Sequence, residues 1–321
     1  MQPCFILGVP RSGTTLLRVL LGNHSQILGF PETPWIVGGY GPASLRRLCE
    51  DLVSDRTGPV ATVSGISAED VYTATREFLE RLTQPALTEA GKRLPLFKTP
   101  NDAVNVDFLF RLYPNASYIH IVRDGRDVAC STAGAKRAAQ LAPRLAEFGE
   151  NNVVNAARRW AAWETAIRDQ MAAAGGLRSI RLCYEDLVRE PKPAISAVCD
   201  FLDIPYQETM IDPGATTADL PAWEAGSTDV RERPRIDSAS VGRWVSTFTR
   251  REAAQIDRLV GNRLVEYGYS RCSDDAPPDD LRRDPIVSRL PLRRAKKILG
   301  IPWRAFLAAL LVVRRTLKEP D

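Results

Sequence analysis

A loop near the start of the chain has the composition of an anion-binding site. The apolar run Phe5–Leu7 is short and is followed by Gly8, which predicts a buried strand. The next residues read GVPRSGTT, and leucines at helical spacing come after them. A strand, a glycine-containing loop and a helix in this order bring backbone N–H groups and the positive end of the helix dipole to one point. The pattern predicts a cradle for a small anionic group.

The loop departs from the Walker A pattern at one position. Gly8 and Gly13 have the Walker spacing, and Thr15 provides the hydroxyl. Thr14 occupies the place of the lysine that serves the β- and γ-phosphates of a triphosphate, which disfavours ordinary triphosphate hydrolysis. Arg11 supplies a positive charge from within the loop. The alternative is a strand-to-helix turn that only packs.

The string GVPRSGTTLL resembles the 5′-phosphosulfate loop of sulfotransferases that use 3′-phosphoadenosine 5′-phosphosulfate (PAPS). It is most similar to the Golgi-type and bacterial branches, which include the tyrosylprotein sulfotransferases. The resemblance implies that the 5′-phosphosulfate is held by Arg11, Ser12, Gly13, Thr14 and Thr15. It also implies a catalytic contribution from Arg11.

Glu32 is the candidate general base. It lies beyond the loop helix in residues 29–35, where two prolines predict an irregular segment. The family has an acidic residue here that takes the proton of the attacking hydroxyl, and the resemblance implies this role for Glu32. The alternative is an ordinary loop charge or a helix N-cap. His24 and His120 are predicted to be structural residues, so neither replaces it.

Lys98 is the candidate cation of the reaction. The segment LPLFKTPN at residues 94–101 predicts a second strand running into a turn. Its KTP string is similar to a family element in which a cation faces the transferred sulfuryl group. Such a cation stabilises the negative charge that grows on the bridging oxygen as the bond to sulfur breaks. The alternative is a solvated lysine at a strand end.

Residues 116–131, ASYIHIVRDGRDVACS, predict a strand, a turn and a helix. They resemble the family's 3′-phosphate site, which implies that Arg123 and Ser131 bind the phosphate on the ribose. Arginine suits this role because its planar fork donates two parallel hydrogen bonds. Arg126 and Asp127 are predicted to cap or pair locally.

Two later segments complete the predicted nucleotide site. The string YEDL follows a third predicted strand and resembles a family element whose tyrosine, here Tyr184, lies near the nucleotide. The polar stretch from Gly226 resembles a mobile loop that closes over PAPS, which implies that Ser227 and Arg243 meet the nucleotide phosphates. Such a lid would exclude water from the activated sulfate.

Strands that alternate with helices predict an α/β fold, with a P-loop-NTPase-like parallel sheet flanked by helices. The 321 residues, 44% of them apolar, can bury a substantial core. A sulfotransferase domain is predicted for residues 1–273, and an acidic, proline-rich linker for residues 274–280.

A basic amphipathic tail is predicted for residues 281–321, which contain eleven Lys/Arg and three Asp/Glu. Its apolar run at 305–313 has basic flanks and about half the length of a membrane span. The composition predicts a helix in the interface of an anionic membrane. Packing on the body and a contact in a homo-oligomer are the alternatives. No nucleic-acid partner is predicted.

The cysteines predict no metal centre, because they form no CxxC pair and no Cys/His cluster. They are expected to be reduced and mostly buried. The phosphate loop begins within about ten residues of Met1, which leaves no room for a signal peptide. A cytoplasmic protein, peripheral on the inner face of the membrane through its tail, is therefore expected.

The predicted reaction is in-line transfer of a sulfuryl group from PAPS to an acceptor hydroxyl, with 3′-phosphoadenosine 5′-phosphate (PAP) as product and no metal. A carbohydrate or glycolipid is the first expectation for the acceptor, because a membrane-seeking tail suits a lipid-linked substrate. Peptide tyrosine and a small secondary metabolite follow. Ala135, where tyrosylprotein sulfotransferases place a further arginine, argues against tyrosine. The rival functions are a small-molecule or nucleotide kinase with a degenerate P-loop and a catalytically silent membrane-docking protein.

Overall fold

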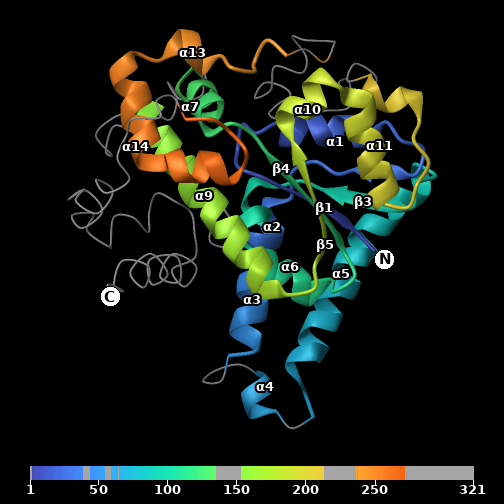
Figure 1. Cartoon of the computed structure of the whole chain (residues 1–321). Helices are drawn as coiled ribbons and strands as arrows, with labels where there is room; N and C mark the ends of the chain where they lie inside the picture. Colours follow the sequence, from blue (N-terminus) through green and yellow to red (C-terminus); the bar gives the residue numbers. More distant parts are fainter. Residues whose placement is uncertain are drawn as a thin grey trace.

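One parallel sheet forms the centre of the molecule (Figure 1). The computed structural model describes residues 2–38, 44–54, 59–63, 65–134, 153–212, 236 and 238–271. Five strands pair in the order β2-β3-β1-β4-β5, all parallel. They are β1 (Cys4–Leu7), β2 (Ile27–Gly29), β3 (Leu94–Phe97), β4 (Ser117–Val122) and β5 (Arg178–Cys183). The predicted parallel α/β fold is confirmed.

Alternate residues of a strand point to opposite sides of the sheet, so apolar strands present two apolar faces. Helices cover both of them. In β1, Phe5 and Leu7 belong to one core, and Cys4 and Ile6 belong to the other. The first core is completed by α2 (Pro34–Val37), α3 (Leu45–Leu52), α5 (Ala68–Glu89), α6 (Val106–Leu112), α7 (Gly125–Gly134), α9 (Val153–Ala174) and α14 (Arg250–Glu266). The second is completed by α1 (Thr14–Gly22), α10 (Tyr184–Arg189) and α11 (Pro191–Phe201). The result is a helix–sheet–helix sandwich.

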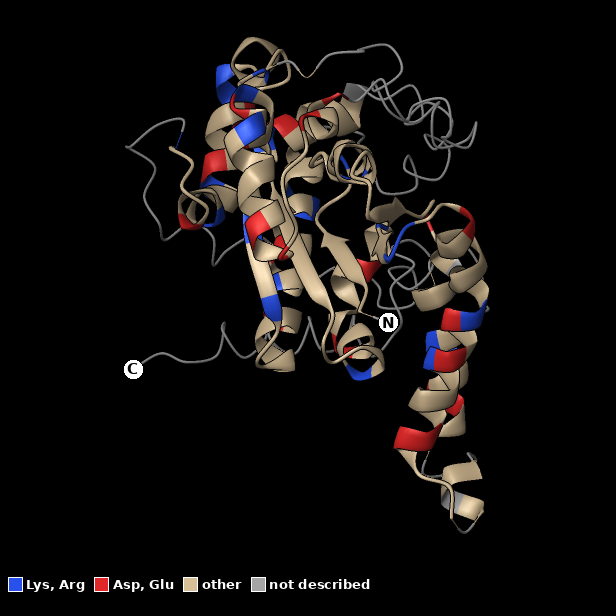
Figure 2. Ribbon diagram, turned by 90° about the vertical axis from the view of Figure 1, so that its right-hand side faces the viewer, with Lys and Arg blue, Asp and Glu red and all other residues tan. Residues whose placement is uncertain are grey.

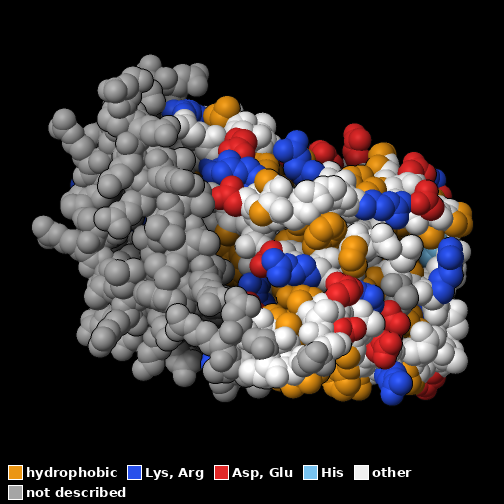
Figure 3. Space-filling view, turned by 90° about the horizontal axis from the view of Figure 1, so that it is seen from below, with side chains coloured by type: hydrophobic (Ala, Val, Ile, Leu, Met, Phe, Trp, Pro, Cys, Tyr) orange, Lys and Arg blue, Asp and Glu red, His pale blue; other side chains and the backbone are white. Residues whose placement is uncertain are grey.

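The connection between β2 and β3 forms an arm that extends away from the sheet (Figures 1 and 2). It contains α3, the short helix α4 (Pro59–Thr62) and α5. Helix α5 begins with a capping box, in which Ser67 accepts a hydrogen bond from the Asp70 N–H and Asp70 accepts one from the Ser67 N–H. Seen from below, basic, acidic and apolar side chains are mixed on the described surface, and neither charge sign forms a broad separate area there (Figure 3).

Residues 27–37 are more regular than predicted. The expectation of an irregular segment at residues 29–35 was wrong at both ends, because Gly29 ends β2 and Pro34 begins α2. Proline is tolerated at the first helical position, since its missing N–H would have no partner within the helix. Strand β2 was also missed, because three residues are too few to show a periodicity. The strand predicted at residues 94–97 is therefore the third in the chain.

The residues predicted to be structural are buried. The His24 Nδ1 accepts a hydrogen bond from the Gln26 N–H just after α1, and the His120 Nε2 on β4 lies 3.0 Å from a Glu164 carboxylate oxygen. The five described cysteines are free thiols, and four of them are buried.

The remaining described elements are two 3₁₀ helices, η1 (Pro100–Val104) and η2 (Glu208–Ile211), and the short helix α13 (Trp244–Thr247). No helix in the described ranges has the length and apolar character needed to cross a bilayer. The predicted linker at 274–280 and the tail at 281–321 lie outside the described residues.

Candidate active site

The predicted catalytic residues and most of the predicted nucleotide ligands follow the C-terminal ends of the strands. In sheet order, β2 is followed by Glu32, β3 by Lys98, β1 by the loop at 8–13, β4 by Arg123 and β5 by Tyr184. The carboxyl ends of parallel strands lie at one edge of a sheet, where α/β proteins bind their ligands. The topology therefore gathers these residues at that edge in a fixed order.

The loop after β1 presents unused hydrogen-bond donors. The Ser12 N–H donates to the Val9 carbonyl at 3.0 Å, which closes a turn. The Ser12 hydroxyl is buried and has no hydrogen-bond partner in the part of the chain that the structure describes. Helix α1 has no side-chain cap at Gly13 and no acidic residue in its first turn. Its first N–H groups are therefore suited to an anion.

Gly13 makes the loop possible in two ways. Its φ of 92° lies in the left-handed region, and a Cβ placed on it would come within 2.4 Å of the Tyr184 ring. We expect Gly13→Ala to lower the free energy of unfolding by about 2 kcal/mol or more and to weaken PAP binding, because the backbone is disfavoured and the ring must move. Gly91→Ala is the matched control, since Gly91 also has a positive φ but no atom within 4 Å of the added Cβ. Thermal unfolding and calorimetry measure both effects, and equal losses in the two variants would contradict the role of the ring contact.

Arg11 and Arg123 connect the loop after β1 to the segment that follows the neighbouring strand β4. The Arg11 Nε donates to the Ser131 hydroxyl at 3.0 Å. The Arg123 Nη1 donates to the Arg11 carbonyl at 3.1 Å, and the Arg123 guanidinium lies 4.3 Å from the centre of the Tyr184 ring. The structure thus brings together four residues that were predicted as ligands from separate motifs. Their binding roles stay predictions.

A buried support holds the end of β4 in place. Glu185 accepts a hydrogen bond from the Asp124 N–H at 3.0 Å and another from the Tyr269 hydroxyl at 2.9 Å. Burial raises the pKa of the Glu185 carboxyl. Arg126 pairs with Asp124 at 2.8 Å, which confirms the predicted local pairing. Arg123 is therefore positioned by contacts that sequence motifs did not reveal.

Arg243 lies beside α7 rather than at a strand end. Asp127 on α7 accepts hydrogen bonds from the N–H groups of Gly242 and Trp244, at 2.7 and 3.0 Å. These partners lie 115 and 117 residues away in the chain, so the prediction of a local contact for Asp127 was wrong. Arg243 lies between these two residues, and its side chain is exposed. Its contact with a nucleotide phosphate stays a prediction. Ser227, the other predicted lid residue, lies outside the described residues.

Glu32 and Lys98 form an ion pair. The Lys98 Nζ lies 2.5 Å from the Glu32 Oε1, and the side chains are 2% and 13% exposed for Lys98 and Glu32 respectively. A pair this sheltered from solvent interacts more strongly than a surface pair. The residues predicted separately as base and cation are therefore partners of each other.

Asp102 is a titratable neighbour of this pair that the sequence analysis did not single out. It is buried, and burial raises the pKa of its carboxyl from 3.8 to about 8. One carboxyl oxygen accepts the Thr99 N–H at 3.1 Å, and the other has no hydrogen-bond partner among the described residues. The pattern Thr-x-x-Asp is a capping-box signature and was the available signal for this contact.

We expect the contribution of Asp102 to the free energy of unfolding to fall as the pH rises from about 4 toward 8. The unfolded carboxyl of Asp102 loses its proton near 3.8, whereas the folded one keeps it to about 8, so the folded state binds more protons in this window. Asp102→Asn imitates the neutral acid. It should reduce the loss of unfolding free energy between pH 5 and pH 8 by more than about 1 kcal/mol. Urea unfolding at both pH values measures it. Parallel pH profiles for the two proteins would contradict a neutral Asp102.

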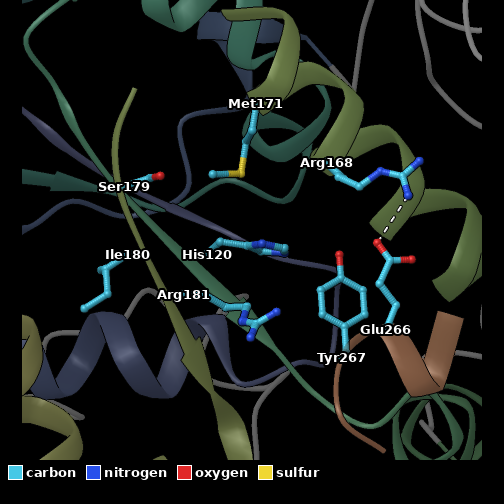
Figure 4. A pocket seen from close by; sticks show the side chains of 8 residues that line it. All are labelled: His120, Arg168, Met171, Ser179, Ile180, Arg181, Glu266 and Tyr267. Carbon is cyan, nitrogen blue, oxygen red and sulfur yellow. Dashed lines mark hydrogen bonds and ion pairs between the residues drawn. The ribbon is translucent and has the colours of Figure 1, made fainter. Parts of the chain in front are cut away.

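A cavity of about 350 Å³ lies elsewhere, between β4, β5, α9 and α14 (Figure 4). Its walls include the His120 ring, Met171 and the Tyr267 ring, and Arg168 on its rim pairs with Glu266 at 3.2 Å. None of the predicted catalytic or nucleotide-binding residues lines it. We therefore locate the candidate site at the strand ends.

Comparison with known proteins identifies the family of the chain. The sequence model of the sulfotransferase family matches residues 3–208, which include the strand ends described above. The chain belongs to the sulfotransferase family. It is an enzyme of this class, and its fold and family support sulfuryl transfer.

The relatives extend the likeness over most of the chain. The sulfotransferase is 26% identical over 290 residues to protein-tyrosine sulfotransferase A of Caenorhabditis elegans, covering 89% of this chain and 71% of that protein. It is 29% identical over 282 residues to nodulation protein NoeE of Sinorhizobium fredii, covering 84% and 66%. The sulfotransferase domain from the curacin biosynthetic pathway has the same fold, with a TM-score of 0.58, 23% identity and coverage of 84% and 98%.

Proposed function

We propose that this sulfotransferase transfers the sulfuryl group of PAPS to an acceptor hydroxyl, with Glu32 as general base. The observation that carries the proposal is the arrangement of three adjacent strands. Strands β2, β3 and β1 are neighbours, and at their carboxyl ends they are followed by the carboxylate of Glu32, the ammonium of Lys98 and the loop that we propose binds the anionic donor. Orientation of the acceptor and donor, and a cation near the developing charge, favour in-line transfer.

The donor end of the site suits a nucleotide with two separate anionic groups. The loop at 8–13 and the start of α1 would hold the 5′-phosphosulfate, with Arg11, Ser12, Thr14 and Thr15 contributing side chains. Arg123 and Ser131 would hold the 3′-phosphate. The Arg123 Nε is buried without a hydrogen-bond partner among the described residues, so this arginine keeps a donor for a further acceptor. Tyr184 would lie beside the nucleotide.

The ion pair explains how the base and the cation can act in one step. The acceptor oxygen forms a bond to sulfur as the bond between sulfur and the bridging oxygen of PAPS breaks. Glu32 takes the acceptor proton and loses its charge. Lys98 is then released from its partner at the moment when negative charge grows on the bridging oxygen of PAP.

Two acceptor classes have specific support. Several relatives are named protein-tyrosine sulfotransferases, which supports a peptide tyrosine. A carbohydrate or glycolipid acceptor is supported by the membrane-seeking composition of the tail, which lies outside the described residues. Both are hydroxyl acceptors that a carboxylate base can serve. The cytoplasmic location, the membrane contact and homo-oligomerisation stay predictions.

The kinase alternative is disfavoured by Thr14 at the Walker lysine position and by the family match. Within the described ranges, no three His, Cys, Asp or Glu side chains are grouped to hold a metal ion.

Calorimetric titration tests the proposal. We expect the purified chain to bind PAP tightly in EDTA and to bind ATP with Mg²⁺ weakly. Incubation with PAPS radiolabelled in its sulfuryl group should then label a tyrosine-containing peptide or an oligosaccharide. Preference for ATP with Mg²⁺ would overturn the proposal, and the acceptor that becomes labelled decides between the two classes.

A further inference from the structure

We infer that Thr99 is a positioning residue that sets the geometry of the Glu32–Lys98 pair through its hydroxyl group. Thr99 follows Lys98 in the chain, and its hydroxyl accepts a hydrogen bond at 2.9 Å from the N–H of Thr33, the residue after Glu32. One buried side chain therefore connects the two segments that carry the predicted base and the predicted cation. The inference rests on the proposed function.

The contact lies just beyond the end of the β2–β3 pairing. Pairing of β2 with β3 extends to Phe30, whose N–H donates to the Leu96 carbonyl at 2.9 Å. The recorded pairing of β2 with β3 ends at this bond, and Pro31 follows on an edge strand, where proline is tolerated. The Thr99 hydroxyl provides a side-chain acceptor in place of a backbone carbonyl, for the first buried N–H after Glu32.

Thr99 is itself held rigidly. It is 1% exposed, and its N–H donates to the Asp102 carboxyl at 3.1 Å. Its hydroxyl also lies 3.3 Å from the Thr33 hydroxyl. A second contact from the same turn reaches the far end of α2, where the Asn101 side chain donates to the Gly38 carbonyl at 2.7 Å. The loop with Glu32 is thus fixed against the end of β3 rather than free to move away from Lys98.

Removing only the hydroxyl tests the inference. Thr99→Val keeps the shape of the side chain but leaves the Thr33 N–H without its acceptor, so Glu32 should move relative to Lys98. We expect kcat with radiolabelled PAPS to fall about 10- to 100-fold, because small displacements of reacting groups are costly, while PAP affinity is retained. Thr99→Ser should restore turnover because it keeps the hydroxyl. Thr83→Val is the matched control, since Thr83 is a buried threonine on α5 away from the strand ends.

A second readout does not depend on turnover. In ¹⁵N-lysine-labelled protein, the buried and ion-paired Lys98 ammonium should exchange its protons slowly and give a correlation that Lys98→Gln removes. We expect the signal in the unmodified protein, in Thr99→Ser and in Thr83→Val, and its loss in Thr99→Val. Retention of the Lys98 signal in folded Thr99→Val would overturn the inference, whether or not the variant binds PAP. If folded Thr99→Val loses the signal but the unmodified protein binds no PAP, the positioning role is supported and only the proposed function is refuted.

Discussion

Glu32→Gln is expected to lower kcat for sulfuryl transfer by about 100-fold or more. The amide cannot take the acceptor proton, and removing a positioned general base typically costs 10²–10⁴-fold in rate. The PAP affinity should be retained or increased, because the substitution removes a negative charge near an anion site and leaves the donor ligands in place. Steady-state rates and calorimetry on the same preparation measure the two effects.

The control for this variant is Glu89→Gln, which removes an exposed carboxylate at the end of α5. It should change neither quantity. Turnover of Glu32→Gln within tenfold of the unmodified enzyme would show that another group accepts the proton. A loss of PAP binding together with turnover would mean that Glu32 holds the site together rather than acting as the base.

Arg123→Ala is expected to weaken PAP binding by about 100-fold or more. The side chain is 6% exposed, and truncating a buried charged partner of an anionic ligand typically costs 2–5 kcal/mol. Two contacts within the protein are lost as well, to the carbonyls of Arg11 and Ser240. Calorimetric titration with PAP, and with adenosine 5′-phosphate as a ligand that lacks the 3′-phosphate, measures the effect.

The comparison of the two ligands separates the causes. If Arg123 binds the 3′-phosphate, the variant should lose most of its preference for PAP over adenosine 5′-phosphate. An equal loss for both ligands would indicate damage to the loop instead. Arg181→Ala, which removes an exposed arginine from β5, is the charge-matched control and should leave both affinities unchanged.

The sequence predicted the parts of the site that depend on the start and end of strands. The loop after β1 and the Arg123 segment were readable because a short apolar run, a turn and a helix leave a local pattern. The order of the strands was not readable in this way, because pairing between distant segments leaves no periodicity. The neighbourhood of Glu32 and Lys98 could therefore be expected only from the family resemblance.

The supporting contacts were the least predictable part. Glu185, Ser240 and Asp102 act through hydrogen bonds to groups 61, 117 and 3 residues away in the chain. Only the last is local enough to leave a sequence signature, the capping box at Thr99. Pro34 was misread for a related reason, since the effect of a proline depends on its position in a helix that the sequence had not located.

The order of the strands has a consequence for how such an enzyme can diversify. The proposed donor ligands Arg11, Arg123 and Tyr184 follow β1, β4 and β5. Glu32 lies at the start of the long β2–β3 connection that forms the arm, and Lys98 follows β3. Insertions or exchanges in that connection leave β1, β4 and β5 untouched in the chain. Under the proposed function, the segment next to the proposed base can therefore change in sequence and length without altering the strands that carry the proposed donor ligands.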